Sequence, residues 1–428
     1  MSVNFKRLRG LVALVLALAL VAAACGDDDS GDEDALGTVV VEEGDAIQIR
    51  TLQAISGAVE SLGTDQNRGT QLAVQDYIAG NPDSKIARFG VDLGTFEDDL
   101  CSADGGTSGA QTIASQADVL GVIGTTCSSA GVPASQILSE AGMVLISGSN
   151  TAPNLTSDLE GNALDAWQPG YYRTAHNDLF QGRAVAEFAF NELGVRQAAA
   201  IHDGSPYADG LATAFANAFE DLGGTMTLYT AVNVGDADMV PVLTDIANSG
   251  PELVYFPIFQ PEGDFIIQQA QDVEGLEDTI FFSADGLQGV EFLSIPETAG
   301  MYFSGPDLRF GDNTGFTGVN YTELVANYTD QFGEAPPQVF HAHTYDATML
   351  LLDAIENVGV LDGGDLRVGR QALRDYLYAV TDFPGVTGSL SCDEFGDCGA
   401  QAIAIVHHLD PNDPAATIQN VVFSAAGR

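Results

Sequence analysis

The sequence predicts an α/β protein made of two lobes, each a doubly wound parallel sheet. Its 428 residues exceed what one hydrophobic core usually supports. Short β-branched runs alternate with segments of helical spacing in both halves of the chain, which is typical of parallel sheets covered by helices. Hydroxyl-rich loops directly follow several of these runs, at the edge where ligands of open α/β sheets bind.

The first half begins with an alternating strand at Ile47–Leu52 and a helix at Gly69–Ala79, which Gly80, Asn81 and Pro82 end. A second strand is expected at 89–93, then a polar loop around Cys101 and a helix that contains Ile113 and Ala114.

The stretch from Asp118 to Thr156 organises this half. It holds two apolar strands, 119–123 and 143–146, with an amphipathic helix between them. Hydroxyl residues follow each strand, and Ser128 or Ser129 is expected to cap the helix so that its first amides point outward. We interpret this stretch as the floor of a binding cleft for small anionic groups.

The pattern restarts after Tyr171. The expected helices are 181–193, 210–222, 240–247 and 264–271, and the expected strands are 198–201, 228–232, 253–256, 279–282 and 301–305. An irregular stretch to Gly318 precedes helices at 321–332, 344–358 and 371–380. The segments 388–391 and 402–407 are expected to form a terminal hairpin around the turn from Cys392 to Cys398.

The N-terminus predicts export. Lys6, Arg7 and Arg9 precede an apolar run from Leu11 to Ala24 that is shorter than the ~20 residues of a membrane-spanning helix, so residues 1–24 are expected to be a signal peptide. The segment 21–26 resembles a bacterial lipobox, with Cys25 as the lipidated residue, although Ala22 stands where leucine is usual. A plain secretory signal cut near Ala24 is the alternative. Residues 25–45 are expected to be an acidic, disordered tether.

Composition limits the partners. The formal net charge is −45 and the only lysines are Lys6 and Lys85, so the chain lacks the basic footprint that nucleic acids and anionic membrane surfaces require. We interpret the acidity as a solvated surface, in keeping with a saline medium; an acidic docking face is the alternative.

Four cysteines follow Cys25, and an even set in an exported protein favours two disulfides. Three pairings are possible, and the local spacing favours Cys101 with Cys127 and Cys392 with Cys398. Neither pair has the internal spacing of a structural zinc site.

Motifs for cofactors and catalysis are absent from the sequence. It has no dinucleotide fingerprint, no phosphate-loop lysine and no Gly-x-Ser-x-Gly elbow, so we expect no cofactor and no enzyme activity. His341 and His343 are expected to be surface or pocket-lining residues, because no set of converging metal ligands surrounds them.

Two polar segments follow predicted strands of the second half. His202–Tyr207 and Ser283–Gly286 are both expected at the sheet edge that faces the floor. Tyr207 could stack on a ligand or hydrogen-bond to it, and Asp285 could hold an ammonium group. From spacing alone a turn role is favoured for Asp285, since Asp-Gly is a common turn pair.

Five segments, in order along the chain, carry a resemblance to a known family. They are GTTCSSAGVPAS (124–135), ISGSNTAPNLT (146–156), YRTAHNDLFQG (172–182), IHDGSPYADGLA (201–212) and SLSCDEFGDCGA (389–400). Together they resemble the type I periplasmic binding proteins of branched-chain amino-acid ABC transporters, over nearly all of the chain after Ile47.

The resemblance implies a set of ligand-binding residues. It implies that Ser128 and its helix amide hold a ligand carboxylate, beside Ser129, and that Ser149, Asn150 and Thr151 contact the ligand. It also implies that Tyr207 closes over the ligand backbone and that Asp285, where the family has a glutamate, pairs with the ammonium group. The pairing of Cys101 with Cys127 matches the cysteine pair of the family.

The same resemblance places the side-chain pocket at Leu62 and Phe259. Leu62 stands where relatives carry an aromatic residue, and Ile258, Phe259 and Gln260 stand where they place tyrosines. We therefore expect an amino-acid ligand, branched-chain or otherwise apolar, whose side chain meets an altered pocket. The rival ligands are an amide, urea or an aromatic acid.

The resemblance also implies a lobe plan with crossings near 174–176, 305–307 and 384–388. The first lobe is then 46–174 with 306–385, and the second is 175–305 with a terminal hairpin and tail at 386–428, which includes the Cys392–Cys398 turn.

Asp393, Glu394 and Asp397 form a loop too short for an EF-hand calcium site, and no metal is expected. The expected role is a lipid-anchored binding protein outside the cytoplasm that delivers its ligand to an ABC permease; a sensory subunit of the same fold is the alternative.

Overall fold

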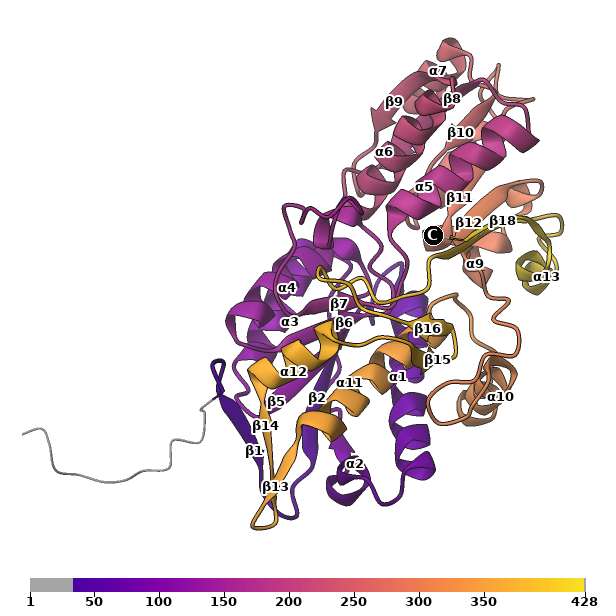
Figure 1. Ribbon diagram of the computed structural model, residues 1–428. Coiled ribbons are helices and arrows are strands. Elements are labelled where there is room, and N and C mark those ends of the chain that lie inside the picture. Colours follow the sequence, from indigo (N-terminus) through magenta and orange to yellow (C-terminus); the bar gives the residue numbers. More distant parts are fainter. Residues whose placement is uncertain (1–33, 427–428) are drawn as a thin grey trace, which may run out of the picture. The chain divides into compact units, whose positions relative to one another are not determined.

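A computed structural model describes residues 34–426 and confirms the α/β architecture, with two main sheets (Figure 1). The first sheet is parallel, with the order β3-β2-β5-β6-β7 and β4 paired to β2. Its strands are β2 (Ile47–Gln53), β3 (Val91–Asp92), β4 (Glu97–Asp98), β5 (Val119–Gly124), β6 (Val144–Ser147) and β7 (Tyr171–Arg173). We call this sheet and its helices the first lobe.

Two layers of helices cover the first sheet, because successive strand residues face opposite sides. Val144 and Ile146 of β6 pack in the core that holds α1 and α11, whereas Leu145 packs in the core that holds α3 and α4. The helices of this lobe are α1 (Glu60–Gly80), α2 (Lys85–Phe89), α3 (Ala103–Ala114), α4 (Ser128–Glu140), the short η1 (Pro153–Leu155), α10 (Tyr321–Phe332), α11 (His341–Val358) and α12 (Arg370–Tyr378).

The second sheet has the order β18-β17-β12-β11-β10-β8-β9, and we call it and its helices the second lobe. Its strands are β8 (Gln197–His202), β9 (Thr225–Ala231), β10 (Leu253–Tyr255), β11 (Ile280–Ala284), β12 (Tyr302–Pro306), β17 (Ala402–His407) and β18 (Val421–Ala426). The pairs from β9 to β12 are parallel, and β17 and β18 are antiparallel additions.

The helices of the second lobe share one apolar core with this sheet. They are α5 (Asp178–Glu187), which continues as the π-helix η2 (Phe188–Glu192), α6 (Pro206–Asp221), α7 (Val240–Ser249), α8 (Glu262–Ala270), η3 (Asp285–Leu287), α9 (Val290–Leu293), η4 (Pro296–Thr298) and α13 (Pro414–Gln419). The pattern-based assignments agree with most of these elements. The predicted strand at 89–93 is shorter, because Phe89 ends α2.

The predicted tether is too long. Residues 38–41 form strand β1 (Thr38–Val41), which pairs with β14 (Asp365–Gly369) in a small sheet completed by β13 (Val360–Asp362). Val39 and Val41 are buried on one face of β1, and the Asp34 carboxylate accepts hydrogen bonds from the first amides of α12. Residues 34–45 therefore belong to the folded body. The predicted signal peptide and Cys25 lie outside the described residues.

The predicted terminal hairpin is wrong. The segment 388–391 forms β16 (Gly388–Leu390), which pairs with β15 (Phe383–Gly385), while β17 pairs with β12 and β18. The reason is burial: Leu390, Phe383 and Cys398 pack in the core of the first lobe. The Cys392–Cys398 turn thus belongs to the first lobe, and the third crossing follows it instead of lying at 384–388. The other expected lobe boundaries stay predictions.

Within residues 34–426, no helix combines the length and apolar character that crossing a membrane requires.

Candidate functional site

The loop after β5 forms a rigid set of hydroxyl groups. The Thr126 hydroxyl accepts a hydrogen bond from the Ala54 amide (2.9 Å) and donates to Gln53 Oε1 (2.7 Å). The predicted serine cap of α4 is wrong: Cys127 is the N-cap, without a side-chain hydrogen bond. Ser128 instead accepts from the Ala152 amide (3.3 Å). Ser128 begins the first turn of α4, where amides have no partner inside the helix.

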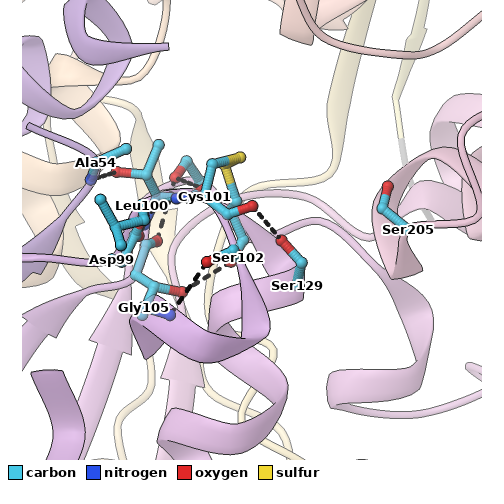
Figure 2. The surroundings of a disulfide bond; sticks show 12 residues. Ala54, Asp99, Leu100, Cys101, Ser102, Gly105, Ser129 and Ser205 are labelled. Atoms are coloured by element: carbon cyan, nitrogen blue, oxygen red, sulfur yellow. Dashed lines mark hydrogen bonds between the residues drawn. A yellow bond between two sulfur atoms is a disulfide. The ribbon is translucent and has the colours of Figure 1, made fainter. Parts of the chain in front are cut away.

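A buried carboxylate, Asp99, and a disulfide fix the backbone of the loop after β5. Asp99 accepts hydrogen bonds from the amides of Cys101 and Thr126, each 2.7 Å long, and burial raises the pKa of Asp99 to about 7. The predicted Cys101–Cys127 disulfide is confirmed. Figure 2 shows Ser129 turned toward this disulfide, where its hydroxyl donates to the Cys101 carbonyl (2.9 Å). Ser129 therefore supports the loop.

The loop after β6 is buried beside the first loop. Ser149 lies close to the Thr126 carbonyl (2.8 Å) and to Gln66 Oε1 (3.0 Å), and its hydroxyl donates to these acceptors. The Asn150 amide group donates to the Thr125 carbonyl (2.9 Å) and accepts from the Thr125 hydroxyl (3.0 Å). A Cβ at Gly131 would lie 2.4 Å from Asn150 Oδ1, so the glycine lets α4 approach this loop.

The second lobe contributes a buried acid and a buried phenol. Asp285 lies at the carboxyl end of β11 in η3, and its Oδ1 accepts from Gln181 Nε2 of α5 (2.6 Å). Burial raises the pKa of Asp285 to about 6. The Tyr207 hydroxyl accepts from the Gly286 amide (3.2 Å), and the Tyr207 ring lies 4.9 Å from the ring of Phe259.

Asp178 is a second buried acid that the sequence analysis did not single out. It is the first residue of α5, has no exposed surface, and its amide donates to the Thr151 carbonyl (3.0 Å). Within residues 34–426, neither oxygen of its carboxylate has a hydrogen-bond partner, and neither does the nearby Thr151 hydroxyl. Burial, and next the charge of Asp285, raise the pKa of Asp178 well above its usual value, although the charge of Arg173 and the nearby Thr151 hydroxyl oppose the rise in part. A cationic group would relieve both effects.

One small cavity brings most of these residues together across the two lobes. Its lining is Leu62, Thr126, Ser128, Ser149, Tyr207, Phe259, Asp285 and Phe340. The predicted site residues Ser129, Asn150 and Thr151 do not line it. The cavity volume is about 10 Å³, roughly the space of one water molecule. A larger ligand therefore requires the walls to separate.

Thr126 and Phe340 are lining residues that the sequence analysis missed. Thr126 could have been found, because it stands in the same hydroxyl run as Ser128. Phe340 gives no local signal: it is the N-cap of α11, far along the chain, and packs with Leu62 in an apolar cluster to which Phe259 adds its ring.

His341 and His343, expected at the surface or in the lining of the pocket, are buried and do not line the cavity. His176 is buried as well, and its ring stacks on Phe340 at 6.3 Å. Burial lowers the pKa of His176 to about 4 and that of His343 to about 3, so both are neutral near pH 7. No group of three or more metal-ligating side chains occurs in the described part of the chain.

A larger hollow of about 390 Å³ lies at the amino-terminal ends of β11 and β12. Its lining combines apolar residues with the acids Glu277, Asp278 and Glu297. It is at the edge of the sheet opposite to the one where parallel α/β sheets bind ligands. The smaller cavity between the lobes is therefore the candidate site.

Comparison with known proteins agrees with this geometry. The family model described as periplasmic binding protein matches residues 46–406. The chain belongs to the periplasmic binding protein family. The family indicates a location outside the cytoplasm and a role in holding solutes, and its members among the relatives are named as binding proteins.

Individual relatives support the same assignment. A Leu/Ile/Val-binding protein homologue of Brucella suis is 30% identical over 345 residues, which cover 80% of this chain and 85% of the relative. The crystal structure of a leucine-binding protein of Thermotoga maritima superposes with a TM-score of 0.73 and 22% identity, over 90% of this chain and 98% of that one. A solute-binding protein of R. palustris in complex with benzoate has a TM-score of 0.70 and 18% identity, over 90% and 98% of the two chains. At these identities the two structures show the fold alone, which confirms the type I binding-protein architecture.

Proposed function

We propose that this periplasmic binding protein captures an amino acid between its lobes and delivers it to a membrane permease of an ABC transporter. The observation that carries the proposal is the pairing of opposite chemistries in one cavity. Ser128 at the start of α4 suits a carboxylate, because helix N-termini and hydroxyl groups attract anions. Asp285 suits an ammonium group. The name of the Brucella relative, a Leu/Ile/Val-binding protein homologue, points to the same ligand class.

Closure of the lobes follows from the cost of burying charge. Within residues 34–426 neither Asp178 nor Asp285 forms a salt bridge, and Arg173, whose charge acts on Asp178, is paired with Asp397. A buried charge without an ion pair is costly. An ammonium group between the lobes would lower that cost, so the ligand stabilises the closed arrangement. Leu62, Phe259 and Phe340 then surround the side chain of the ligand, which favours an apolar amino acid.

Titration calorimetry with purified protein tests the ligand class. We expect heat from leucine, isoleucine or valine and none from acetamide, urea or benzoate. Binding of an amide, urea or benzoate with no response to any amino acid would overturn the proposal. The aromatic acid is the second candidate, because the ring pair of Tyr207 and Phe259 forms an aromatic wall and the same fold binds benzoate in R. palustris.

The anchoring of the protein is part of the proposal. Cys25, at the end of the apolar N-terminal run, would carry the lipid. Detergent phase partitioning of the wild type and of Cys25→Ser tests this. The wild type should enter the detergent phase and Cys25→Ser the aqueous phase; partitioning of both into the aqueous phase would leave a plain secretory signal. Co-purification with a permease separates a transport role from a sensory one.

A further inference from the structure

We infer that residues 392–398, which we call the disulfide loop, position the ligand site through Asp397. The chain of contacts runs from the disulfide to Asp397, from Asp397 to Arg173, and from Arg173 to the backbone of the loop 149–152. The inference deepens the proposed function, because Ser149 of that loop lines the candidate site.

Arg173 holds the loop 149–152 in place. Its side chain has no exposed surface. Its Nη1 donates to the carbonyls of Asn150 (3.2 Å) and Ala152 (2.9 Å), and its Nη2 donates to the Thr156 hydroxyl (2.6 Å). The guanidinium group therefore fixes the backbone on both sides of Thr151.

Asp397 neutralises Arg173 and also reaches the first crossing between the lobes. Its Oδ1 pairs with Arg173 Nε, and its Oδ2 accepts from Asn177 Nδ2 (3.3 Å). Asn177 is the N-cap of α5, the first helix of the second lobe. Burial lowers the pKa of Arg173, but the charge of Asp397 and its hydrogen bond, together with Tyr171 and Asp178, outweigh burial, and the net direction is upward. Asp397 thus joins the ligand loop to the crossing segment.

The disulfide loop is built to present this carboxylate. The Cys392–Cys398 disulfide closes it, and Asp393 Oδ1 accepts from the amides of Phe395 and Asp397, both at 2.9 Å. The loop lies along β7: the Arg173 amide donates to the Gly396 carbonyl and the Cys398 amide donates to the Arg173 carbonyl, both at 2.9 Å. A Cβ on Gly396 would lie 2.2 Å from the Tyr171 carbonyl oxygen, so this close approach requires glycine.

The covalent ring matters because it restricts the conformations of a short loop before folding and after opening. Without it, the Asp397 carboxylate spends less time on Arg173. The guanidinium group, still buried, then seeks other acceptors, and the carbonyls of Asn150 and Ala152 lose a fixed donor. Ligand affinity falls although every residue that lines the cavity is unchanged.

Hydrogen exchange on the ligand-free protein tests this chain of contacts. The variants are Cys392→Ser with Cys398→Ser, Asp397→Asn, and Glu394→Gln as the matched control, since Glu394 is an exposed acid of the same loop. We expect about tenfold faster exchange at 149–152 and 174–177 in the first two variants, unchanged exchange in α6 and α7, and wild-type behaviour in the control. A calorimetric titration with leucine should show about tenfold weaker binding in the same two variants.

The outcomes are separable. Wild-type exchange at 149–152 in both test variants would overturn the inference, as would a uniform rise over the whole chain, which marks general loss of stability. If Asp397→Asn fails to fold, the double cysteine variant decides alone, because it keeps both Asp397 and Arg173. If the wild type does not bind leucine, the proposed function fails, and the exchange data still decide the role of the disulfide loop.

Discussion

The two walls of the cavity differ in how far the protein itself satisfies their polar groups. On the first lobe, Thr126, Ser128 and Ser149 all have hydrogen-bond partners inside the chain, and Asp99 and a disulfide hold the backbone below them. On the other side, Asp285 has Gln181 as its partner, and Asp178, which does not line the cavity but feels the charge of Asp285, has no hydrogen-bond partner of good geometry among residues 34–426. The first-lobe wall is thus held in place by the protein alone. The second-lobe side has buried acids that a cationic group of the ligand would stabilise.

The comparison predicts that substitutions beneath the first-lobe wall mainly lower the stability of the protein. Asp99→Ala leaves the buried amides of Cys101 and Thr126 without an acceptor, and should lower the free energy of unfolding by about 2 to 4 kcal/mol. Urea denaturation measures the change. Asp104→Ala, an exposed acid in the first turn of α3, is the control and should stay near the wild type. Equal stability of Asp99→Ala and wild type would show that the first-lobe wall does not depend on this carboxylate.

Substitutions in the second-lobe wall should instead lower the affinity for the ligand. Asp285→Ala removes the charged partner proposed for the ammonium group and should weaken amino-acid binding by at least about 1.5 kcal/mol. Calorimetry with leucine measures this. Asp278→Asn, at the amino end of the same strand β11, is the matched control and should bind like the wild type. Unchanged affinity in Asp285→Ala would remove Asp285 from the site.

Ligand affinity should depend on pH through Asp285 of the second-lobe wall. Because burial raises the pKa of Asp285 to about 6 and the ammonium group requires the ionised acid, affinity should fall about tenfold between pH 7 and pH 5. The stability that Asp285 contributes to the ligand-free protein runs the other way: it is fully present below about pH 4 and is lost as the pH rises through about 6.

The control for this pH dependence is Asp285→Asn, whose affinity for leucine should be weak and nearly independent of pH. The comparison with wild type is needed because the lowered pKa of His176, about 4, makes stability fall with acidity in the same range. A wild-type affinity that stays constant from pH 7 to pH 5 would contradict the role of an ionised Asp285.

The smallest expected effect distinguishes the two walls most directly. Asp178→Asn should raise the thermal stability of the ligand-free protein by about 1 kcal/mol, because it removes a buried acid without a partner, and should weaken leucine binding about threefold. Thermal unfolding measures the change in stability, and calorimetry measures the change in leucine affinity. Glu187→Gln, near the other end of α5, is the control. A loss of stability in Asp178→Asn would mean that the carboxylate has a structural partner.

The sequence predicts the elements whose pattern is local. The apolar runs at 119–123 and 143–146, each followed by hydroxyl residues, correspond to β5 and β6 and to the loops of the site. The Cys101–Cys127 pairing was favoured by spacing and by the family resemblance. These signals are strong because a buried parallel strand and a hydroxyl-rich loop each have a characteristic composition.

The remaining features depend on contacts between distant residues. Segment 388–391 alternates like a strand, but its partner is decided by the burial of Leu390 beside Phe383 in the first-lobe core. Asp178 follows Asn177 at the start of a helix, where an acid is common, so nothing in the local sequence reveals that its carboxylate is buried near Asp285. Phe340 reaches the cavity only because α11 packs on α1.

Strand β1 has a mechanical consequence. It pairs along its whole length with β14, and Asp34 hydrogen-bonds to the start of α12. A force applied to the chain at Asp34 is therefore carried first by the first lobe. Under the anchoring proposed at Cys25, the first lobe is the tethered half, and we expect the second lobe, with Asp285 and Tyr207, to carry the proposed closing movement.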